Sequence, residues 1–394
     1  MTTKNQLRCG VAALLLCTMA MGARAQNPPP ASPQPPAPSR PAFPPPTPNA
    51  TLVSPDVLPD RHVVFRLYAP QAQDVRVHSE WAGSSGPETL TKADNGVWSV
   101  TVGPLDPGVY RYLFTVDGVE TVDPRNPRTS ESLNNVQSLL EVPGAAFEDI
   151  RDVPHGAVAS VWYHSTALGA TRRMHVYTPP GYEAGTGRYP VLYLLHGAGD
   201  TDEAWSTVGH AGFILDNLIA DGKARPMIVV MPAGHISRQF GFGGRGRMGQ
   251  DQFNDDFLQD IMPYVEAHYR VSADRTHRAI AGLSMGGLQT LNIALPHLDK
   301  FAYVGVFSSG WFGQTAEQIE QEHRDALDNA AAKKGLRLLW LAWGAQDLAR
   351  PSSQVMLDVF QRHGFQPVWH ESAGGHTWIN WRDYLHEFAP LLFH

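Results

Sequence analysis

The sequence predicts a doubly wound α/β sheet preceded by a small β-sandwich. Residues 53–142 contain short runs in which apolar and polar residues alternate, and such alternation is typical of half-buried strands. From about Val158 onward, continuous apolar runs alternate with helical segments, as expected for strands that helices cover on both faces. The sandwich is therefore expected first along the chain and the α/β sheet second.

Residues 1–25 have the features of a secretory signal. Lys4 and Arg8 precede the apolar run 11–21, and small residues at 23–25 supply a cleavage site. The run is too short to span a bilayer, and no later stretch reaches about 18 uninterrupted apolar residues. We therefore expect export to the periplasm or beyond, with no membrane insertion after the signal is removed.

Cysteine content and charge exclude several classes of function. Cys9 and Cys17 both lie inside the signal, so the exported chain has no thiol for a disulfide, a nucleophile or a metal site. Lipid attachment at Cys17 is the alternative to secretion, although the bulky Leu16 is a poor match for that cleavage site. A net charge of -7 and a pI near 6.2 argue against a nucleic-acid partner and favour a neutral or weakly polar substrate.

Two further segments precede the α/β region. Residues 26–50 are rich in proline, which favours extended polyproline II, so this segment is expected to be a spacer. A tether to a cell surface and a remnant without a role are both open interpretations. Residues 51–143 are expected to form the sandwich, with strands at 62–68, 97–102 and 109–116 and hairpin turns at Asn95-Gly96 and Asp117-Gly118.

A resemblance supports the sandwich. The stretch GVWSVTVGPLDPGVYRYLFTVDG, followed by DPRNP, is similar to the immunoglobulin-like early-set modules of carbohydrate-binding module family 48, which precede many polysaccharide-active enzymes. Trp81, Trp98, Tyr110 and Tyr112 could present flat faces to sugar rings. Aromatic residues that alternate in a small sandwich more often fill its core, so packing is the favoured interpretation.

Residues 156–394 are expected to form the α/β domain. Asn254 is a candidate N-cap of a helix that reaches Tyr269, on which Phe257, Ile261 and Val265 share one face. Function in such sheets lies at the carboxyl ends of the strands. The expected strands are 191–195, 227–231, 279–281, 304–307 and 338–341, with another near Val368.

The strongest chemical signal follows the strand at 279–281. Gly282-Leu283-Ser284-Met285-Gly286 is a G-x-S-x-G motif between a strand and a helix, which is the nucleophile elbow of an α/β hydrolase. Its glycines allow a turn so tight that side chains beside Ser284 would collide with neighbouring backbone. A plain glycine-rich turn is the alternative.

Chain order then selects the partners of Ser284. In α/β hydrolases the acid and the histidine follow the serine on loops after later strands. Asp347 and His376 stand at such positions, so Asp347 is the predicted acid and His376 the predicted base. The rivals are Glu371 as the acid and His370 or His386 as the base, while Asp383 falls on the last helix.

Two backbone N–H groups should stabilise the anionic intermediate. Met285 follows the nucleophile and supplies one, and Ala198 in the loop 196–199 is the candidate for the other. The imidazole of His196 is expected to support this loop rather than act as a base.

These elements together resemble a known group of enzymes. LLHGAGD, a downstream Trp205, DFLQDIMPYVE, RAIAGLSMGG, GAQD and GGHTWINWRDYL are similar to the esterase-D-like group, which includes carbohydrate esterase family 1. The resemblance spans nearly all of residues 156–394 and implies a serine esterase with the nucleophile, acid, base and oxyanion loop given above. Feruloyl and acetylxylan esterases belong to this group and enterochelin esterases share its architecture, so the resemblance does not fix the acyl group.

Aromatic residues near strand ends are candidate substrate contacts. Trp205, Trp311, Phe312 and Trp378 could wall an acyl pocket, although packing is an equal alternative for each. Residues 238–247 are rich in glycine and arginine and are expected to form a loop beside the site. Its arginines could bind an acidic substrate, but a solvated loop is the simpler interpretation.

The sequence as a whole predicts a serine carboxylester hydrolase that needs no metal and no cofactor. Its expected partner is an ester on plant cell-wall polysaccharide. The alternatives are a siderophore or other small-ester hydrolase, a non-catalytic carbohydrate-binding protein, and an acyltransferase of the mycolyl type that uses the same triad.

Overall fold

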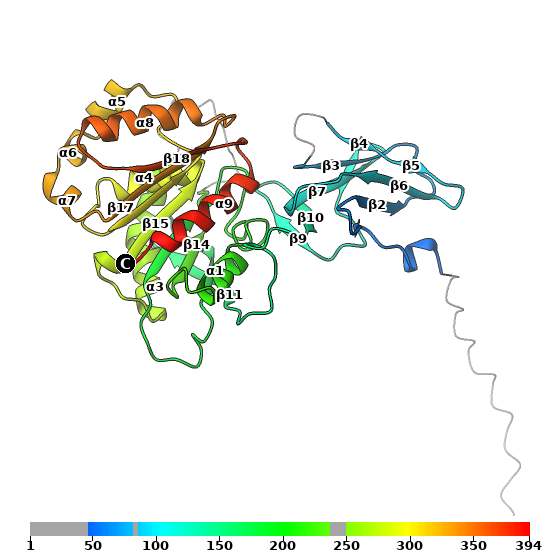
Figure 1. Cartoon of the computed structure of the whole chain (residues 1–394), viewed down its shortest axis with the longest axis horizontal. Helices are drawn as coiled ribbons and strands as arrows, with labels where there is room; N and C mark the ends of the chain where they lie inside the picture. Colours follow the sequence, from blue (N-terminus) through cyan, green and yellow to red (C-terminus); the bar gives the residue numbers. More distant parts are fainter. Residues whose placement is uncertain (1–45, 82–85, 237–249) are drawn as a thin grey trace, which may run out of the picture. The chain divides into compact units, whose positions relative to one another are not determined.

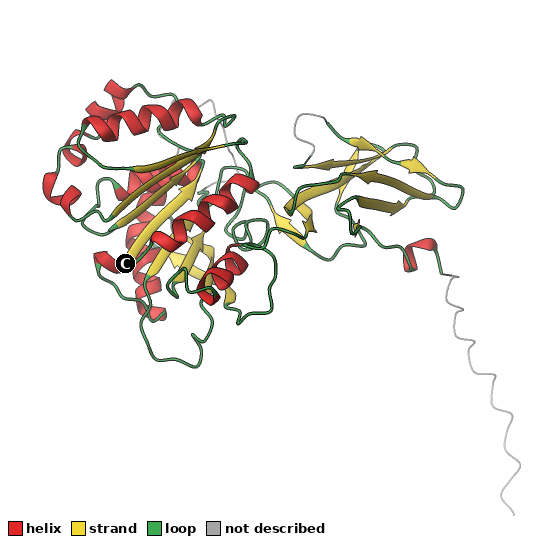
Figure 2. Ribbon diagram, in the orientation of Figure 1, coloured by secondary structure: helices red, strands yellow, loops and turns green. Residues whose placement is uncertain are grey.

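The computed structural model describes residues 46–81, 86–236 and 250–394. The signal and nearly all of the proline-rich spacer, as well as the basic segment 238–247, lie outside these ranges. The described chain forms an antiparallel β-sandwich followed by an α/β domain (Figures 1 and 2). This order of elements confirms the predicted fold class.

The sandwich consists of two sheets. One has the strand order β1-β2-β6-β5, and the other has the order β4-β3-β7-β10-β9 with β8 paired to β7. A short 3-10 turn, η1 (Pro48–Ala50), precedes them. The strands are β1 (Asp56–Val57), β2 (Val63–Tyr68), β3 (Val75–Ser79), β4 (Glu88–Thr89), β5 (Thr91–Lys92), β6 (Val97–Val102), β7 (Gly108–Val116), β8 (Val119–Thr121), β9 (Thr129–Glu131) and β10 (Val136–Val142).

Alternation places one side of each long strand in the sandwich core. In β2 the buried residues are Val63, Phe65 and Leu67, as a period of two requires. The expected hairpin turns are present: Asn95-Gly96 lies between the paired strands β5 and β6, and Asp117-Gly118 joins β7 to β8. Asp117 and Gly118 both have positive φ, at 48° and 88°, which is the backbone of a tight hairpin turn.

The α/β domain is built on one sheet of order β11-β12-β14-β13-β15-β16-β17-β18. From β14 to β18 neighbouring strands are parallel, whereas β11, β12 and β14 pair antiparallel. The antiparallel edge was not predicted, because β11 is mostly exposed and lacks a continuous apolar run. The strands are β11 (Ala157–Ser165), β12 (Ala170–Thr178), β13 (Val191–Leu195), β14 (Ile228–Pro232), β15 (Arg278–Leu283), β16 (Tyr303–Phe307), β17 (Leu338–Gly344) and β18 (Val368–Ser372).

Helices cover both faces of this sheet, and the side chains of each strand alternate between two cores. Tyr193 of β13 belongs to the buried cluster that includes residues of α3, α4 and α8, while its neighbour Leu194 belongs to the cluster that includes residues of α1 and α9. The helices are α1 (Ala211–Ala220), α2 (Gln250–Asp256), α3 (Met262–His268), α4 (Met285–Ala294), α5 (Ala316–Glu322), α6 (Arg324–Leu327), α7 (Ala330–Lys334), α8 (Arg350–Arg362) and α9 (Trp378–Phe388), with the 3-10 turns η4 (Arg275–His277) and η5 (Ala389–Leu391).

One predicted helix start is wrong. Asn254 is not an N-cap, because it lies inside α2, which is already helical at Gln250. A π-helical turn, η3 (Phe257–Ile261), joins α2 to α3 and was not predicted. Phe257, Ile261 and Val265 are all completely buried, so the predicted apolar face is correct.

Candidate active site

Three side chains at the carboxyl end of the sheet form one hydrogen-bonded chain. Ser284 follows β15, Asp347 follows β17, and His376 lies between β18 and α9. Nε2 of His376 lies 2.9 Å from Oγ of Ser284, and Nδ1 of His376 lies 2.8 Å from Oδ1 of Asp347. The structure therefore brings together the three residues that chain order selected.

The surroundings of Asp347 keep its carboxylate ionised. Burial alone would raise the pKa of Asp347, but hydrogen bonds from His376 and Ser308 outweigh burial and lower the pKa below its ordinary value. The backbone N–H of Ala349 also donates to Oδ1, at 2.7 Å. A charged, fixed carboxylate holds the proton of His376 on Nδ1, which leaves Nε2 free to accept the serine proton.

The turn that carries Ser284 is strained and very closely packed. Ser284 has φ 51° and ψ −116°, a conformation that a non-glycine residue adopts only when its surroundings enforce it. A Cβ atom at Gly286 would lie 2.6 Å from the carbonyl oxygen of His196, and one at Gly287 would lie 2.4 Å from Cβ of Ser309. Neither position could hold a side chain without moving the turn.

The residue after the nucleophile begins a helix. Met285 is the first residue of α4, so its backbone N–H is one of the groups that has no partner within the helix. The positive end of the helix dipole lies at the same place. This arrangement suits the predicted role of Met285 as a donor to a developing anion.

The loop that follows β13 runs directly against the serine. A Cβ atom at Gly197 would lie 3.7 Å from Cβ of Ser284 and 2.7 Å from a side-chain carbon of Leu283. The N–H of Asp200 donates to the carbonyl of Gly197 at 3.2 Å, which closes a turn with Ala198 at its second position. Ala198, the predicted second donor, is the residue that follows Gly197 in this turn, and its role stays a prediction.

Two histidines hold this loop, and both are neutral. The N–H of Gly234 donates to Nε2 of His196 at 2.9 Å, so Nδ1 of His196 carries the proton and donates to the carbonyl of Gly197 at 2.8 Å. Burial lowers the pKa of His196. Burial and the neighbouring His196 lower the pKa of His235 to about 4, and the His235 ring also hydrogen-bonds the backbone of Ala198.

The β-sandwich contacts the same loop. The N–H of Leu133 donates to the carbonyl of Gly199 at 2.9 Å, and Ser132 forms an antiparallel bridge with Asp200. Arg111 of β7 donates to Oδ1 of Asp200 at 2.8 Å, with only 11% and 5% of the two side chains exposed. The sandwich is therefore part of the structure that positions the predicted oxyanion donor.

Arg111 also contacts Trp378, the first residue of α9, which lies close to His376 in the sequence. Its guanidinium carbon lies 5.9 Å from the centre of the Trp378 ring, and Trp378 comes two residues after His376. Oε1 of Glu80 accepts from Nε of Arg111 at 2.7 Å. One arginine of the sandwich thus joins the loop after β13 to the start of α9.

Asp202 anchors the far end of the loop. Its two carboxylate oxygens accept from Nε and Nη2 of Arg173 at 2.8 and 2.9 Å, and Nδ1 of His175 lies 2.8 Å away. Burial would raise the pKa of Asp202, but these hydrogen bonds lower it to about 2. Two side chains of β12, the second strand of the sheet, therefore hold the loop through one buried carboxylate.

A cavity of about 410 Å³ lies beside this loop. Its lining combines residues of the sandwich with residues of β11, β12 and the loops after β13 and β14. They include Glu131, Leu133, Trp162, Arg172, Thr201 and His235.

The three tryptophans predicted to contact substrate lie in the core instead. Trp205 is completely buried, and its Nε1 donates to the carbonyl of Leu195 at 3.1 Å. Trp311 and Trp378 are 2% and 3% exposed. They therefore present almost no surface to a ligand, and Trp205 and Trp378 instead pack edge to face beneath the site with ring centres 5.1 Å apart. Of the four predicted aromatic contacts only Phe312 is exposed, at 40%.

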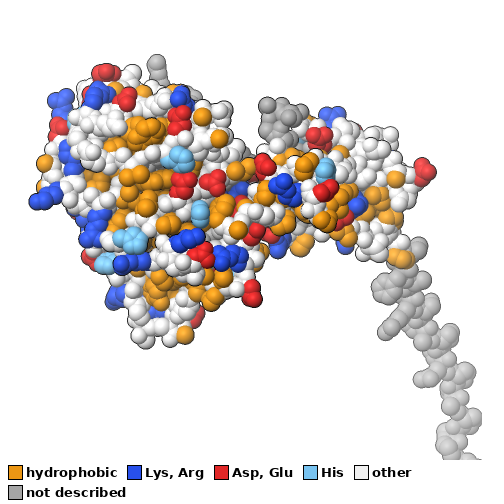
Figure 3. Space-filling model, viewed as in Figure 1, with side chains coloured by type: hydrophobic (Ala, Val, Ile, Leu, Met, Phe, Trp, Pro, Cys, Tyr) orange, Lys and Arg blue, Asp and Glu red, His pale blue; other side chains and the backbone are white. Residues whose placement is uncertain are grey.

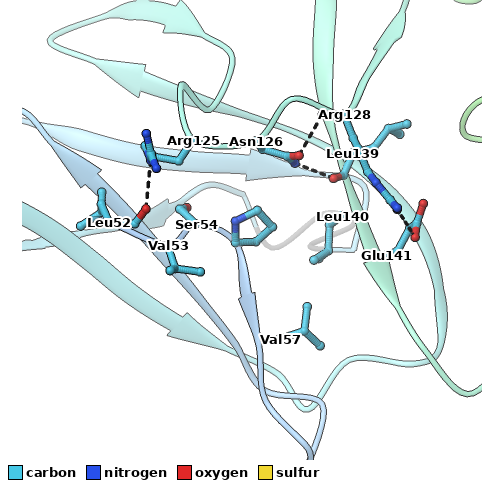
Figure 4. Close-up of a pocket in the computed structure, with 11 residues that line it drawn as sticks. Leu52, Val53, Ser54, Val57, Arg125, Asn126, Arg128, Leu139, Leu140 and Glu141 are labelled. Atoms are coloured by element: carbon cyan, nitrogen blue, oxygen red, sulfur yellow. Dashed lines mark hydrogen bonds and ion pairs between the residues drawn. The ribbon is translucent and has the colours of Figure 1, made fainter. Parts of the chain in front are cut away.

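The aromatic residues of the sandwich also pack inward. Trp98, Tyr110 and Tyr112 are buried, and Trp81 stacks on Phe65 with ring centres 5.2 Å apart. Trp98, Tyr110 and Tyr112 therefore fill the core, as the packing interpretation predicts, and Trp81 packs against that core while partly exposed. A cavity of about 430 Å³ on the sandwich is lined by aliphatic and charged side chains, as Figure 4 shows, including Val57, Leu140, Arg128 and Glu141.

The rival triad residues have other partners. Oε2 of Glu371 accepts from Trp343 at 2.8 Å and from Arg350 at 3.0 Å. Nδ1 of His370 lies 2.8 Å from Glu387, and the ring of His386 packs against Phe147. None of these contacts involves Ser284. Asp383, the remaining acidic residue considered, lies on α9, where burial raises its pKa.

Sequence reasoning missed several supporting residues. The Trp381 ring stands perpendicular to the His376 ring with centres 5.0 Å apart, and Nε1 of Trp381 donates to Oγ of Ser308 at 2.9 Å. Oγ of Ser309 donates to the carbonyl of Ser284 at 2.6 Å. Ser308 and Ser309 directly follow β16, so the rule that function lies at strand ends could have found them.

We expect Asp202→Asn to lower the free energy of unfolding by about 2 kcal/mol near neutral pH, because the folded-state pKa of about 2 lies below the ordinary value of 3.8. This contribution is fully present above about pH 4 and is lost as pH falls through about 2. Urea unfolding followed by tryptophan fluorescence at several pH values measures it. Asp94→Asn, at an exposed position, is the control, and a difference from wild type that does not change with pH would contradict the charge argument.

The described residues contain no helix long and apolar enough to cross a membrane. They also contain no group of three or more histidine, aspartate or glutamate side chains arranged to hold a metal ion.

Comparison with known proteins agrees with this geometry. Residues 165–390 match the family described as "Putative esterase", and residues 53–127 match carbohydrate-binding module 48, the isoamylase N-terminal domain. An endo-1,4-beta-xylanase/feruloyl esterase of Xylanibacter ruminicola is 34% identical over 340 residues, which is 84% of this chain and 44% of that protein. The chain thus spans less than half the length of this curated relative.

Solved structures show the same architecture. A ferulic acid esterase with 28% sequence identity superposes with a TM-score of 0.53 over 60% of this chain and 97% of its own. The enterobactin esterase of Shigella flexneri superposes with a TM-score of 0.60 over 84% of this chain and 94% of its own, at 20% identity. The elbow at Ser284, its hydrogen-bonded histidine and aspartate, and the family match lead to one conclusion: the chain belongs to an esterase family of carboxylic ester hydrolases with the α/β-hydrolase fold, and a carbohydrate-binding module 48 domain precedes its catalytic domain.

Proposed function

We propose that this chain removes feruloyl or acetyl groups from plant cell-wall polysaccharide through an acyl-serine intermediate. The observation that carries this proposal is the similarity to the xylanase/feruloyl esterase, because it extends over 84% of the chain. The ferulic acid esterase structure supports the catalytic domain separately, at 28% identity.

The geometry supports the following acylation step. Oγ of Ser284 attacks the ester carbonyl carbon while Nε2 of His376, 2.9 Å away, accepts its proton. The buried carboxylate of Asp347 stabilises the imidazolium that forms. The carbonyl oxygen becomes an anion that the N–H groups of Met285 and Ala198 would stabilise.

Collapse of the intermediate breaks the bond to the alcohol oxygen, and His376 returns the proton to that oxygen. The sugar leaves, and the acyl group stays on Ser284. Water then attacks the carbonyl carbon of the acyl-serine while His376 accepts a proton from the water. The bond between this carbon and Oγ of Ser284 breaks, His376 returns the proton to Oγ, and the carboxylic acid departs.

We also propose that the protein is exported to the periplasm or the outside of the cell. The basic start, short apolar run and small-residue site in residues 1–25 support this location. A polysaccharide substrate outside the cell is consistent with it.

A substrate panel tests the proposed function. We expect hydrolysis of methyl ferulate or acetylated xylan, measured as acid released, and a fall of at least about 1000-fold in Ser284→Ala, because the nucleophile is lost. Faster cleavage of a catecholate trilactone would favour a siderophore esterase. Transfer of the acyl group to an added acceptor sugar would indicate an acyltransferase, and failure to hydrolyse any aryl acetate would favour a binding protein.

We expect Arg111→Ala to lower kcat about tenfold and to change KM less than twofold. Loss of the ion pair with Asp200 should displace the oxyanion loop, which acts mainly in the transition state. Arg111→Lys should restore part of kcat. Methyl ferulate kinetics together with the thermal midpoint check this expectation.

Arg66→Ala is the matched control, because Arg66 pairs with Asp56 inside the sandwich. If Arg111→Ala changed only the thermal midpoint, or if the control lowered kcat equally, the contact with Asp200 would have no role in turnover.

A further inference from the structure

A groove between α8 and the edge strand β18 has no role in the chemistry above. It encloses about 820 Å³, and its lining includes Trp343, Trp369, Arg350, Gln354, Asp358 and Glu371. In the space-filling view of Figure 3, apolar side chains gather below α8, with acidic and histidine side chains beside them. This is the largest of the cavities described here.

Trp369 gives the groove a flat aromatic surface. Its side chain is 49% exposed, and its ring lies nearly parallel to the buried Trp343 ring, at an angle of 4° with centres 5.8 Å apart. Nε1 of Trp343 donates to Glu371 at 2.8 Å, so the supporting ring is fixed. Trp369 therefore has one side against a rigid ring while much of its surface faces solvent.

The polar side chains around this surface are suited to a neutral ligand. Arg350 and Glu371 form an ion pair at 3.0 Å and largely cancel each other's charge. Gln354 and Asp358 stand four residues apart on α8, so they lie on the same side of the helix. Together these groups offer hydrogen-bond donors and acceptors next to an aromatic face, which is the combination that a hydroxyl-rich ring requires.

The groove lies close to the reacting groups along the chain. Trp343 and Trp369 are on β17 and β18, whose carboxyl ends lead to Asp347 and His376. Trp369 is three residues before the end of β18, which is about 10 Å at about 3.3 Å per residue. A polymer held here would stay beside the triad after each ester is cleaved, and such tethering raises the local substrate concentration.

We propose that this groove binds the neutral sugar backbone of the polysaccharide, with one pyranose ring stacked on Trp369. This proposal rests on the proposed function, since it names a second contact for the same substrate. It also assigns the aromatic sugar surface to the catalytic domain rather than to Trp98, Tyr110 and Tyr112 of the sandwich, which are buried.

Binding of soluble neutral xylan, measured by affinity gel electrophoresis, tests the proposal. All variants carry Ser284→Ala, so the measurement does not depend on hydrolysis. We expect Trp369→Ala to weaken xylan retention about fivefold or more, which corresponds to about 1 kcal/mol of lost stacking. Trp369→Phe should keep part of the retention, and higher salt should change little because the ligand is neutral.

Two controls separate this proposal from others. With Ser284 intact, Trp369→Ala should leave kcat/KM for methyl ferulate within about twofold of wild type, so a loss of both activities would indicate damage to the triad and overturn the proposal. Leu391→Ala removes an exposed apolar side chain, 42% exposed in η5, that lines neither cavity of the α/β domain described above, and it should retain xylan as the Ser284→Ala parent does. Trp162, 62% exposed on the opposite edge strand β11, lines the cavity beside the loop after β13 and is the rival aromatic site.

Other outcomes contradict the proposal directly. If Trp369→Ala binds xylan as the Ser284→Ala parent does, or if Trp162→Ala alone loses binding, the groove is not the sugar site. If Trp369→Ala instead changes the oligomeric state in size-exclusion chromatography, the exposed edge of β18 is an interface between copies. Failure of all substrates in the panel would reject the proposed function without changing these binding results.

Discussion

The close packing between the turn at Ser284 and the loop after β13 is the constraint on which the site depends. The backbone of Ser284 is held at a positive φ, and Gly286 lies so close to the carbonyl of His196 that a Cβ atom would be 2.6 Å away. Two segments distant in sequence can approach this closely only because β13 and β15 are adjacent parallel strands. The pairing of these two strands therefore sets the position of Ser284 relative to the loop after β13 through the backbone alone.

The residues that bear the chemistry were predictable because each obeys a local or topological rule. Glycines on both sides of Ser284 are required by the turn, and Asp347 and His376 follow strands in a fixed order. The supporting residues obey no such rule. Arg111 belongs to an alternating strand of the sandwich, and no property of that strand indicates that its side chain meets a loop 89 residues later.

The wrong interpretations have physical causes as well. Trp205 stands just after a strand end, but a large apolar ring gains more free energy from burial than from exposure beside a pocket. Asn254 has the chemistry of a helix cap, yet the helix begins earlier and passes through a π-helical turn that no sequence period reveals. The edge strand β11 is exposed along most of its length, so it lacks the apolar run that predicts a central strand.

Three imidazoles lie at Ser284 or at the loop after β13, and they differ in burial and in hydrogen-bond partners. His376 is partly exposed and must gain and lose a proton in every half-reaction, whereas His196 is shielded from water and both of its ring nitrogens are engaged with backbone groups. A protonated His196 ring could not accept the hydrogen bond from the N–H of Gly234, so charging it would disturb the loop that carries Ala198. Burial lowers the pKa of both His196 and His235 and so favours their neutral forms. Of the three rings, His376 is therefore the one suited to take up the serine proton.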